Sequence, residues 1–408
     1  MSAGEFHGGR NALHGDHGEI EMRVGGFRIE FQRAAQFLLA CAVPAAPAEC
    51  RAEVLVGAGI VRGVQHGLCV RQKWRFRARS MDSRLGHPIA ANWLARARAG
   101  CPGHGRGSHR PHLPLSQKPV PRMQAIPQPR DEVSFQRDGE EIARFHFAQD
   151  QKRPFVFPVI GPSGRSLTRM GHPHDPITHS HHNSVWFSHQ FVGGTDFWSD
   201  KGGRISHVKV LRYEDADEVA FAETENAWLD KEGKPVMHDR RRISVKPLAG
   251  KEWLLLLDLQ LEARTADVPL AETAFGMLGV RMAKTIGVLD GGGTIRNSEG
   301  GVDEVACFRK PARWMDYSGP ITPAAQEGIA LFDHPQNPNH PVPFHCRGDG
   351  WMGASLTFAS PLTVKKGEPL RLRYALYVHA GMPAPAKIEE QWKAFAATPW
   401  TEFPEKKK

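Results

Sequence analysis

The chain has 408 residues with a formal net charge of +9, and 40% of the residues are hydrophobic. The basic excess is local, because residues 1–122 contain 18 Lys and Arg against 8 Asp and Glu, a net charge of +10, which leaves −1 for the remainder. A nearly neutral body creates no field that attracts phosphate backbones, so we expect no nucleic-acid partner. The sequence also lacks an apolar run of the ~20 residues that a membrane helix needs, and we expect no membrane association.

Residues 1–122 differ from the rest in composition. Arg supplies 16 of their 18 basic residues, and Gly, Ala, His and Pro dominate without a sustained hydrophobic period. This composition indicates a disordered segment, or an extension translated from a start codon too far upstream, with Met123 as the better start. A basic arm that binds nucleic acid or a membrane is the alternative. The body, residues 123–408, keeps only Cys307 and Cys346, too few for a disulfide framework, which favours a reduced, cytoplasmic protein.

The body shows strand patterns along most of its length. Short alternating or aromatic runs occupy residues 133–135, 142–147 and 155–157. Leu and other apolar residues alternate with partly polar neighbours over 253–261 and 370–378, which is typical of strands because alternate side chains leave opposite faces. Residues 386–397 have a helical pattern. Many strands, frequent Gly and Pro turns and one late helix predict an all-β fold, a large antiparallel sandwich with one C-terminal helix.

The densest polar cluster has five histidines within eleven residues, followed by His189. These are His172, His174, His179, His181 and His182. If the segment 179–189 is extended, His179 and His181 face one side with Cα atoms about 6.6 Å apart. Such a pair can place two imidazoles on one divalent metal, with a third ligand from elsewhere in the fold. It can instead act as a proton donor and substrate clamp, because imidazole titrates near neutrality. A loop whose histidines bond to main-chain carbonyls is the third interpretation.

Later segments add further polar candidates. The loop 296–301 offers a guanidinium, an amide and an acid, which suit the hydroxyl groups of a polar ligand. Residues 313–319 combine a Trp with Arg and Asp, and sugar rings stack on such aromatic faces while their hydroxyls bond to charged groups. An ordinary aromatic core strand is the alternative for this segment. Two more histidines, His334 and His345, follow near Pro-rich turns, and loops of this kind commonly carry functional residues. Asp196 either accepts a hydrogen bond from an imidazole or caps its own turn.

These patterns give a specific set of candidate residues. The expected acid–base residues are His179, His181, His182, His189, Glu299, Asp316, Asp333 and His334. The expected substrate-binding residues are Arg296, Asn297, Arg313, Trp186, Trp314 and His345. His179 and His181 are also the expected ligands of a divalent metal, if one is bound. We expect all of these side chains to meet in one concave pocket.

From about Arg153 to Phe395, the body resembles a bacterial family of uncharacterised soluble proteins that carries the label "methane oxygenase PmoA". Several long motifs carry the resemblance in the right order. They are Arg153-Pro154-Phe155, Gly161-Pro162 and the segments 179–189, 194–198, 295–300, 312–320 and 328–338. In the first histidine block Thr178, Ser180 and Asn183 stand where the family has Asp, Pro and Arg.

The resemblance implies a β-sandwich similar to the galactose-mutarotase-like supersandwich. Genes of the family often lie near those of sugar oxidoreductases, which implies that these proteins act on carbohydrates and that the substrate is small and sugar-like. Our first hypothesis is therefore an enzyme that acts on a carbohydrate or polyol by acid–base chemistry, through mutarotation, epimerisation or elimination. A metal-dependent oxidoreductase with iron or copper is the second hypothesis. A non-catalytic sugar-binding module is the third.

Overall fold

A computed structural model describes residues 119–403 with their side chains and, before them, the backbone of six strands. These strands are β1 (Ile20–Val24), β2 (Phe27–Phe31), β3 (Glu49–Val56), β4 (Gly59–His66), β5 (Trp74–Ser80) and β6 (Ile89–Ala95). They form three antiparallel pairs, β1–β2, β3–β4 and β5–β6, which the sequence analysis did not predict. The rest of residues 1–118 lies outside the described residues, so the expectation of a disordered or mis-assigned extension stays a prediction. The chain divides into two compact units, residues 1–115 and 116–408.

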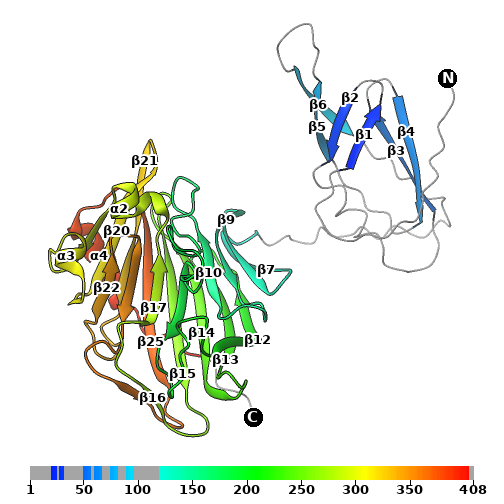
Figure 1. The fold of residues 1–408 in the computed structure, drawn as a ribbon. Helices are drawn as coiled ribbons and strands as arrows, with labels where there is room; N and C mark the ends of the chain where they lie inside the picture. The colour runs from blue at the N-terminus through cyan, green and yellow to red at the C-terminus, as the bar shows by residue number, and fades with distance from the viewer. Residues whose placement is uncertain are drawn as a thin grey trace. The chain divides into compact units, whose positions relative to one another are not determined.

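The second unit is a sandwich of two large antiparallel sheets (Figure 1). One sheet has nine strands in the order β19-β22-β23-β17-β11-β10-β9-β8-β7. Their bounds are β7 (Met123–Gln128), β8 (Glu132–Arg137), β9 (Glu140–His146), β10 (Phe155–Val159), β11 (Val185–His189), β17 (Gly276–Arg281), β19 (Lys310–Pro311), β22 (Pro343–Arg347) and β23 (Trp351–Ser355). Its centre joins strands that are far apart in sequence, because β11 pairs with β17 and β17 pairs with β23.

The other large sheet has eight strands in the order β12-β13-β14-β15-β25-β21-β20-β18. Their bounds are β12 (Arg204–Glu214), β13 (Ala220–Leu229), β14 (Pro235–Pro247), β15 (Trp253–Glu262), β18 (Thr294–Asn297), β20 (Trp314–Thr322), β21 (Ala325–Asp333) and β25 (Leu370–Ala380). A small third pair joins β16 (Val268–Leu270) to β24 (Leu362–Val364). Both long alternating segments of the sequence are strands, and β15 and β25 pair side by side.

The main hydrophobic core lies between the two large sheets. Strand alternation decides which side chains enter it: Leu255 and Leu257 of β15 belong to this core, whereas Leu254 belongs to a second cluster on the opposite side of the strand. The second cluster is covered by α4 (Pro385–Ala396), whose Ile388 and Phe395 are buried against the outer face of the eight-stranded sheet. Three short helical segments were not predicted: η1 (Lys284–Ile286), α2 (Val288–Gly291) and α3 (Asp303–Cys307).

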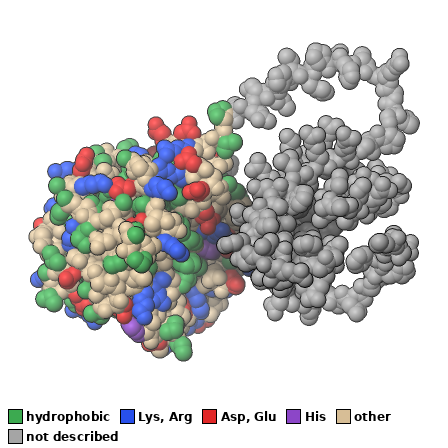
Figure 2. All heavy atoms as spheres, turned by 90° about the horizontal axis from the view of Figure 1, so that it is seen from above, with side chains coloured by type: hydrophobic (Ala, Val, Ile, Leu, Met, Phe, Trp, Pro, Cys, Tyr) green, Lys and Arg blue, Asp and Glu red, His purple; other side chains and the backbone are tan. Residues whose placement is uncertain are grey.

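The all-β sandwich with a C-terminal helix is confirmed, since the described elements are mostly strands and α4 is the one long helix among residues 119–403. None of the helices in the described part of the chain has the length and apolarity that crossing a bilayer requires. Cys307 and Cys346 are both buried free thiols. Basic and acidic side chains are interspersed on the face of the second unit seen in Figure 2.

Candidate functional site

The outer face of the nine-stranded sheet carries a row of rings that the strand register brings together. In β11, Val185 and Phe187 point into the core, so Trp186 between them points outward. Trp186 stands opposite Gly279 of β17, Gly279 opposite Gly353 of β23, and Gly353 opposite His345 of β22. The row therefore runs Trp186–Gly279–Gly353–His345 across four neighbouring strands.

The two glycines make room for indole rings to lie against the sheet. A Cβ atom on Gly279 would stand 2.8 Å from Cη2 of Trp351 and 2.9 Å from Cζ2 of Trp186, and one on Gly353 would stand 2.9 Å from Cζ2 of Trp351. Any side chain at either position would displace a ring. Trp198 joins the two indoles, with ring centroids 5.3 Å from Trp186 and 5.6 Å from Trp351.

The histidine-rich segment 171–183 forms an irregular loop beside these rings. Asp175 shapes one turn of the loop, because its main-chain carbonyl accepts a hydrogen bond from the His179 amide and its carboxylate accepts one from the Thr178 amide. A second turn brings the His182 amide to the His179 carbonyl. The expected extended strand over 179–189 is therefore wrong for its first part, since β11 begins only at Val185. The side chain of Asp175 and the second turn give the loop a local alternative to strand pairing.

The loop nevertheless gathers its imidazoles. Ring centroids lie 5.8 Å apart for His179 and His181, 4.5 Å for His181 and His182, and 4.7 Å for His172 and His179. His182 stacks nearly parallel on Trp351, at 5.4 Å and 14°, and also on Trp186, at 5.8 Å and 26°. The expected clustering of His179, His181 and His182 thus holds, and Trp186 and His345 belong to the same assembly. His345 lies 6.0 Å from Trp351, edge to face.

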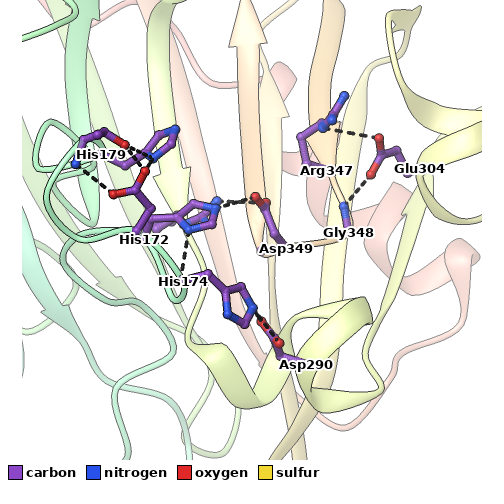
Figure 3. Close-up of polar contacts among 12 residues, drawn as sticks. His172, His174, His179, Asp290, Glu304, Arg347, Gly348 and Asp349 are labelled. Carbon is purple, nitrogen blue, oxygen red and sulfur yellow. Dashed lines mark hydrogen bonds and ion pairs between the residues drawn. The ribbon is translucent and has the colours of Figure 1, made fainter.

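Two carboxylates outside the loop hold its histidines in place (Figure 3). His172 Nε2 donates to Asp349 Oδ2 at 2.8 Å, while its Nδ1 accepts the amide of His174. His174 contacts Asp290 through Nε2, at 2.9 Å from Oδ1. The other oxygen of Asp349 accepts a bond from Nη1 of the fully buried Arg281 at 2.9 Å. Burial alone would raise the pKa of Asp349, but Arg281 and His172 outweigh it and hold that pKa below its usual value.

Arg153 holds the end of the loop 171–183 through hydrogen bonds. Its guanidinium is 1% exposed and donates to the His181 carbonyl at 3.1 Å, to Oδ1 of Asn183 at 2.6 Å and to the Trp198 carbonyl at 2.9 Å. It also pairs with Asp200 at 3.2 Å. A single buried cation thus ties both ends of the site, the histidine loop and the segment that carries Trp198, to the start of β10.

Burial keeps most of the clustered imidazoles neutral. Desolvation, helped by the positive charge of Arg153, lowers the pKa of His181 to about 4. Desolvation together with neighbouring His181 and Arg281 lowers the pKa of His182 to about 2, and desolvation lowers that of His345 to about 4. At neutral pH these rings are therefore uncharged, and each has one donor and one acceptor nitrogen.

Several buried polar atoms of the site have no hydrogen-bond partner. They are the indole nitrogens of Trp186 and Trp351, Nδ1 of His182 and His345, and Nε and Nη2 of Arg281. Buried polar groups are normally paired, and leaving one unpaired costs about 1–3 kcal/mol. Trp186, Trp351 and His182 are 1–8% exposed and Arg281 is fully buried, whereas His345 is half-buried. A cleft of about 460 Å³, lined by residues including Lys284, Asp290 and Pro320, adjoins His174 through Asp290.

Four of the other predicted acid–base residues lie in or just after strands of the eight-stranded sheet: Glu299, Asp316, Asp333 and His334. Asp316 of β20 faces away from the core and binds Nε of Arg296 at 3.2 Å and Nε2 of His379 at 2.9 Å, and it is fully buried. Burial alone would raise the pKa of Asp316, but its interactions with His379 and Arg296 outweigh this and hold that pKa below its usual value. The carboxylate is therefore occupied by structural partners, and its predicted place beside the histidine loop is wrong.

The remaining members of that group are tied to α4 and its surroundings. Arg313 bonds to Glu299 at 3.0 Å, and Trp314 donates its indole N–H to Glu389 of α4 at 2.8 Å. Asn297 accepts the amides of its own turn, from Glu299 and Gly301. Asp333 binds Asn337 and His340, and His334 packs edge-on against Phe395. The expectation of a single pocket is wrong for Glu299, Asp333, His334, Arg296, Asn297, Arg313 and Trp314, because β18, β20 and β21 belong to the other sheet.

His189 and Asp196 are also held by local partners. His189 is fully buried at the end of β11, where Nε2 contacts the Thr357 hydroxyl at 2.8 Å and Nδ1 accepts the Phe191 amide. Asp196 accepts the amides of Trp198 and Ser199, which is the turn-capping alternative. Among residues 119–403, no three His, Cys, Asp or Glu side chains are grouped so as to hold a metal ion. The expected metal pair, His179 and His181, therefore has no third ligand in this part of the chain.

Sequence reasoning missed Asp349, Arg281 and Trp351 as members of the site. Asp349 and Trp351 belong to the segment Gly348-Asp349-Gly350-Trp351, where Gly350 has φ +93° and turns the chain between β22 and β23. An acid flanked by glycines before a Trp is a detectable signal of a turn with a polar function. Arg281 gives no such signal, because it ends an ordinary apolar strand.

Comparison with known sequences places the chain in one family. No curated protein matches it. Residues 132–393, which include both large sheets apart from β7 and most of α4, match a family described as "Family of unknown function (DUF6807)". That match covers more than half of the chain and contains every residue of the histidine loop and of the ring cluster. The chain therefore belongs to this family of unknown function, DUF6807.

Proposed function

We propose that the outer face of the nine-stranded sheet, at the histidine loop and the Trp186–Trp351 cluster, binds a carbohydrate or polyol and catalyses proton transfer on it. The observation that carries the proposal is the stack of His182 on Trp351 and Trp186, with the half-buried His181 beside it. Flat aromatic faces next to hydrogen-bonding side chains suit a sugar, whose C–H faces stack and whose hydroxyls bond.

Neutral imidazoles favour one reaction type over the others. Since the pKa of His181 is held at about 4, its imidazole is a weak base that exchanges protons with hydroxyl groups more readily than with C–H bonds. Mutarotation needs only proton transfer to and from oxygen atoms, whereas epimerisation and elimination remove a proton from carbon. We therefore place mutarotation first. His181 and His179 are the candidate proton carriers, and His182 and the indoles are the candidate ring-binding surface.

Other features support a carbohydrate ligand or weaken the alternatives. The resemblance to the family labelled "methane oxygenase PmoA", whose genes lie near those of sugar oxidoreductases, supports a sugar-like substrate. A metal-dependent oxidoreductase lacks a third protein ligand within residues 119–403. A non-catalytic sugar-binding module would typically present exposed tryptophans, but Trp186 and Trp351 are 1% and 4% exposed and lie among clustered histidines.

The test is an exchange assay with the full-length protein. Saturation-transfer NMR measures how fast the α and β anomers of aldoses and uronic acids interconvert, with and without protein. We expect acceleration by the wild type and its loss in His181→Ala. The matched control is His207→Ala, which removes a half-buried imidazole from β12, outside the site. If the wild type accelerates no anomer exchange, or if His181→Ala accelerates it equally, the assignment is wrong.

A further inference from the structure

The buried guanidinium of Arg281 has one edge without partners. Nη1 donates to Asp349 at 2.9 Å, whereas Nε and Nη2 have no hydrogen-bond partner and the side chain is 0% exposed. Nε and Nη2 lie on the same side of the planar group, and this edge binds a carboxylate through two parallel hydrogen bonds. The fold thus positions two parallel N–H donors of Arg281 for which the structure has no acceptor.

Two more unused donors belong to the strands on either side of β17, β11 and β23. Trp351 stands opposite Arg281 in the β17–β23 register, and its ring centroid is 5.4 Å from that of Trp186. The indole N–H groups of both tryptophans are buried and unpartnered. An indole nitrogen only donates, so neither group can pair with Arg281 or with the other indole. What is missing from this corner of the site is an acceptor.

The two carboxylates nearest these donors already bind other groups. Asp349 binds Arg281 with one oxygen and His172 with the other. Asp200 binds Arg153 with one oxygen and the Ser180 hydroxyl with the other. The site therefore presents surplus donors to its ligand, and they include a guanidinium.

We infer that the ligand of this site carries a carboxylate, and that Arg281, Trp351 and Trp186 bind it. On the basis of the proposed function, the substrate class is then a sugar acid, such as a uronic acid. A carboxylate fits better than a phosphate, because Asp349 already balances part of the charge of Arg281 and a single free edge suits a planar monoanion. Binding requires the loop 171–183 to open, which changes the surroundings of the clustered indoles.

Matched pairs of sugars test the inference on the full-length protein. D-Galacturonate and D-galactose differ at C6, where a carboxylate replaces a hydroxymethyl group, and D-glucuronate and D-glucose form a second pair. Isothermal titration calorimetry gives each Kd, and tryptophan fluorescence reports loop opening. We expect each uronate to bind at least tenfold more tightly than its neutral partner.

Two variants connect that preference to the residues. Arg281→Lys keeps the charge but loses the two-pronged edge, and Trp351→Phe keeps a ring but loses one N–H donor. Both should lower the preference for the uronate, measured as the ratio of the Kd of the neutral sugar to that of the uronate. Trp392→Phe is the matched control, since Trp392 is a half-buried indole on α4 that donates to the Asp333 carbonyl. It should keep the wild-type preference.

The outcomes separate this inference from the proposed function. Equal affinity for uronate and neutral sugar, or a preference that survives in both Arg281→Lys and Trp351→Phe, overturns the carboxylate assignment and leaves the proposed sugar site standing. Tighter binding of D-glucose 6-phosphate than of D-glucuronate also overturns it. If none of the sugars binds, the proposed function fails as well.

Discussion

Replacing His182 with Phe should make the fold more resistant to acid. Phe keeps a flat ring on Trp351 and Trp186 but cannot titrate. In the folded protein desolvation, together with His181, Arg281, His179 and His172, lowers the pKa of His182 to about 2, whereas in an unfolded chain it is about 6.5. The unfolded state therefore binds more protons as the pH falls below about 6.5. Stability that is complete above that pH is lost progressively down to about pH 2.

The size of the effect at pH 5 depends mainly on the unfolded state. Protonation of an unfolded imidazole 1.5 pH units below its pKa stabilises that state by about 1.36 × 1.5, or about 2 kcal/mol, while folded His182 stays neutral. Between pH 8 and pH 5 the variant should thus lose about 2 kcal/mol less unfolding free energy than the wild type. The variant still loses some unfolding free energy over this range, because the pKa values of His181 and His345 are also lowered in the folded protein, to about 4.

Urea unfolding followed by tryptophan fluorescence at the two pH values measures this difference. Absolute stability at pH 8 can change through packing, so only the change between pH values is compared. Trp198→Phe is the control, since it alters the same ring cluster without removing a titrating group and should keep the full wild-type loss. An identical loss in wild type and His182→Phe would refute the argument that the site holds this imidazole neutral.

Three further predictions concern packing and anchoring. Gly279→Ala should destabilise the fold by about 1–3 kcal/mol in urea unfolding, because its Cβ would meet both indoles. Trp186→Phe should relieve part of this loss in the double variant, and strict additivity would contradict the proposed clash. Arg153→Met should speed amide hydrogen exchange in the loop 171–183, while exchange in β13 stays unchanged; equal protection of the loop would show that Arg153 does not hold it. Asp239→Asn should cost about 3–5 kcal/mol in urea unfolding, because Asp239 pairs with the buried Arg241 at 2.6 Å, and a loss below 1 kcal/mol would contradict this.

Strand positions were predictable from the sequence because alternation is a local property. Trp253–Glu262 and Leu370–Ala380 bury every second side chain in the core between the sheets, so the pattern of Leu residues is enough to identify them. The helix at Pro385–Ala396 was predictable for a similar reason. The short segments η1, α2 and α3 have only three to five residues each, too few to show a period.

The composition of the site was not predictable, because it depends on register between distant strands. The alternation of β20 shows that Asp316 and Tyr317 point to opposite sides, but it does not show which sheet contains the strand. The pairing of β11 with β17, and of β17 with β23, places Trp186 on the same face as Arg281 and Trp351, which lie 95 and 165 residues further along the chain. The closeness of the histidine rings was predictable, since the density of histidines is a local feature of the sequence.

The two outer faces of the sandwich are covered in different ways. On the eight-stranded sheet, α4 supplies Ile388 and Phe395, apolar side chains that stabilise the fold by leaving water. On the nine-stranded sheet, the cover over Trp186 and Trp351 is a loop of imidazoles, and it leaves Nδ1 of His182 buried without a partner. An apolar side chain at position 182 would stack equally well without that cost. Packing alone therefore does not explain the imidazole at position 182, and its unpaired nitrogen supports the proposed ligand site.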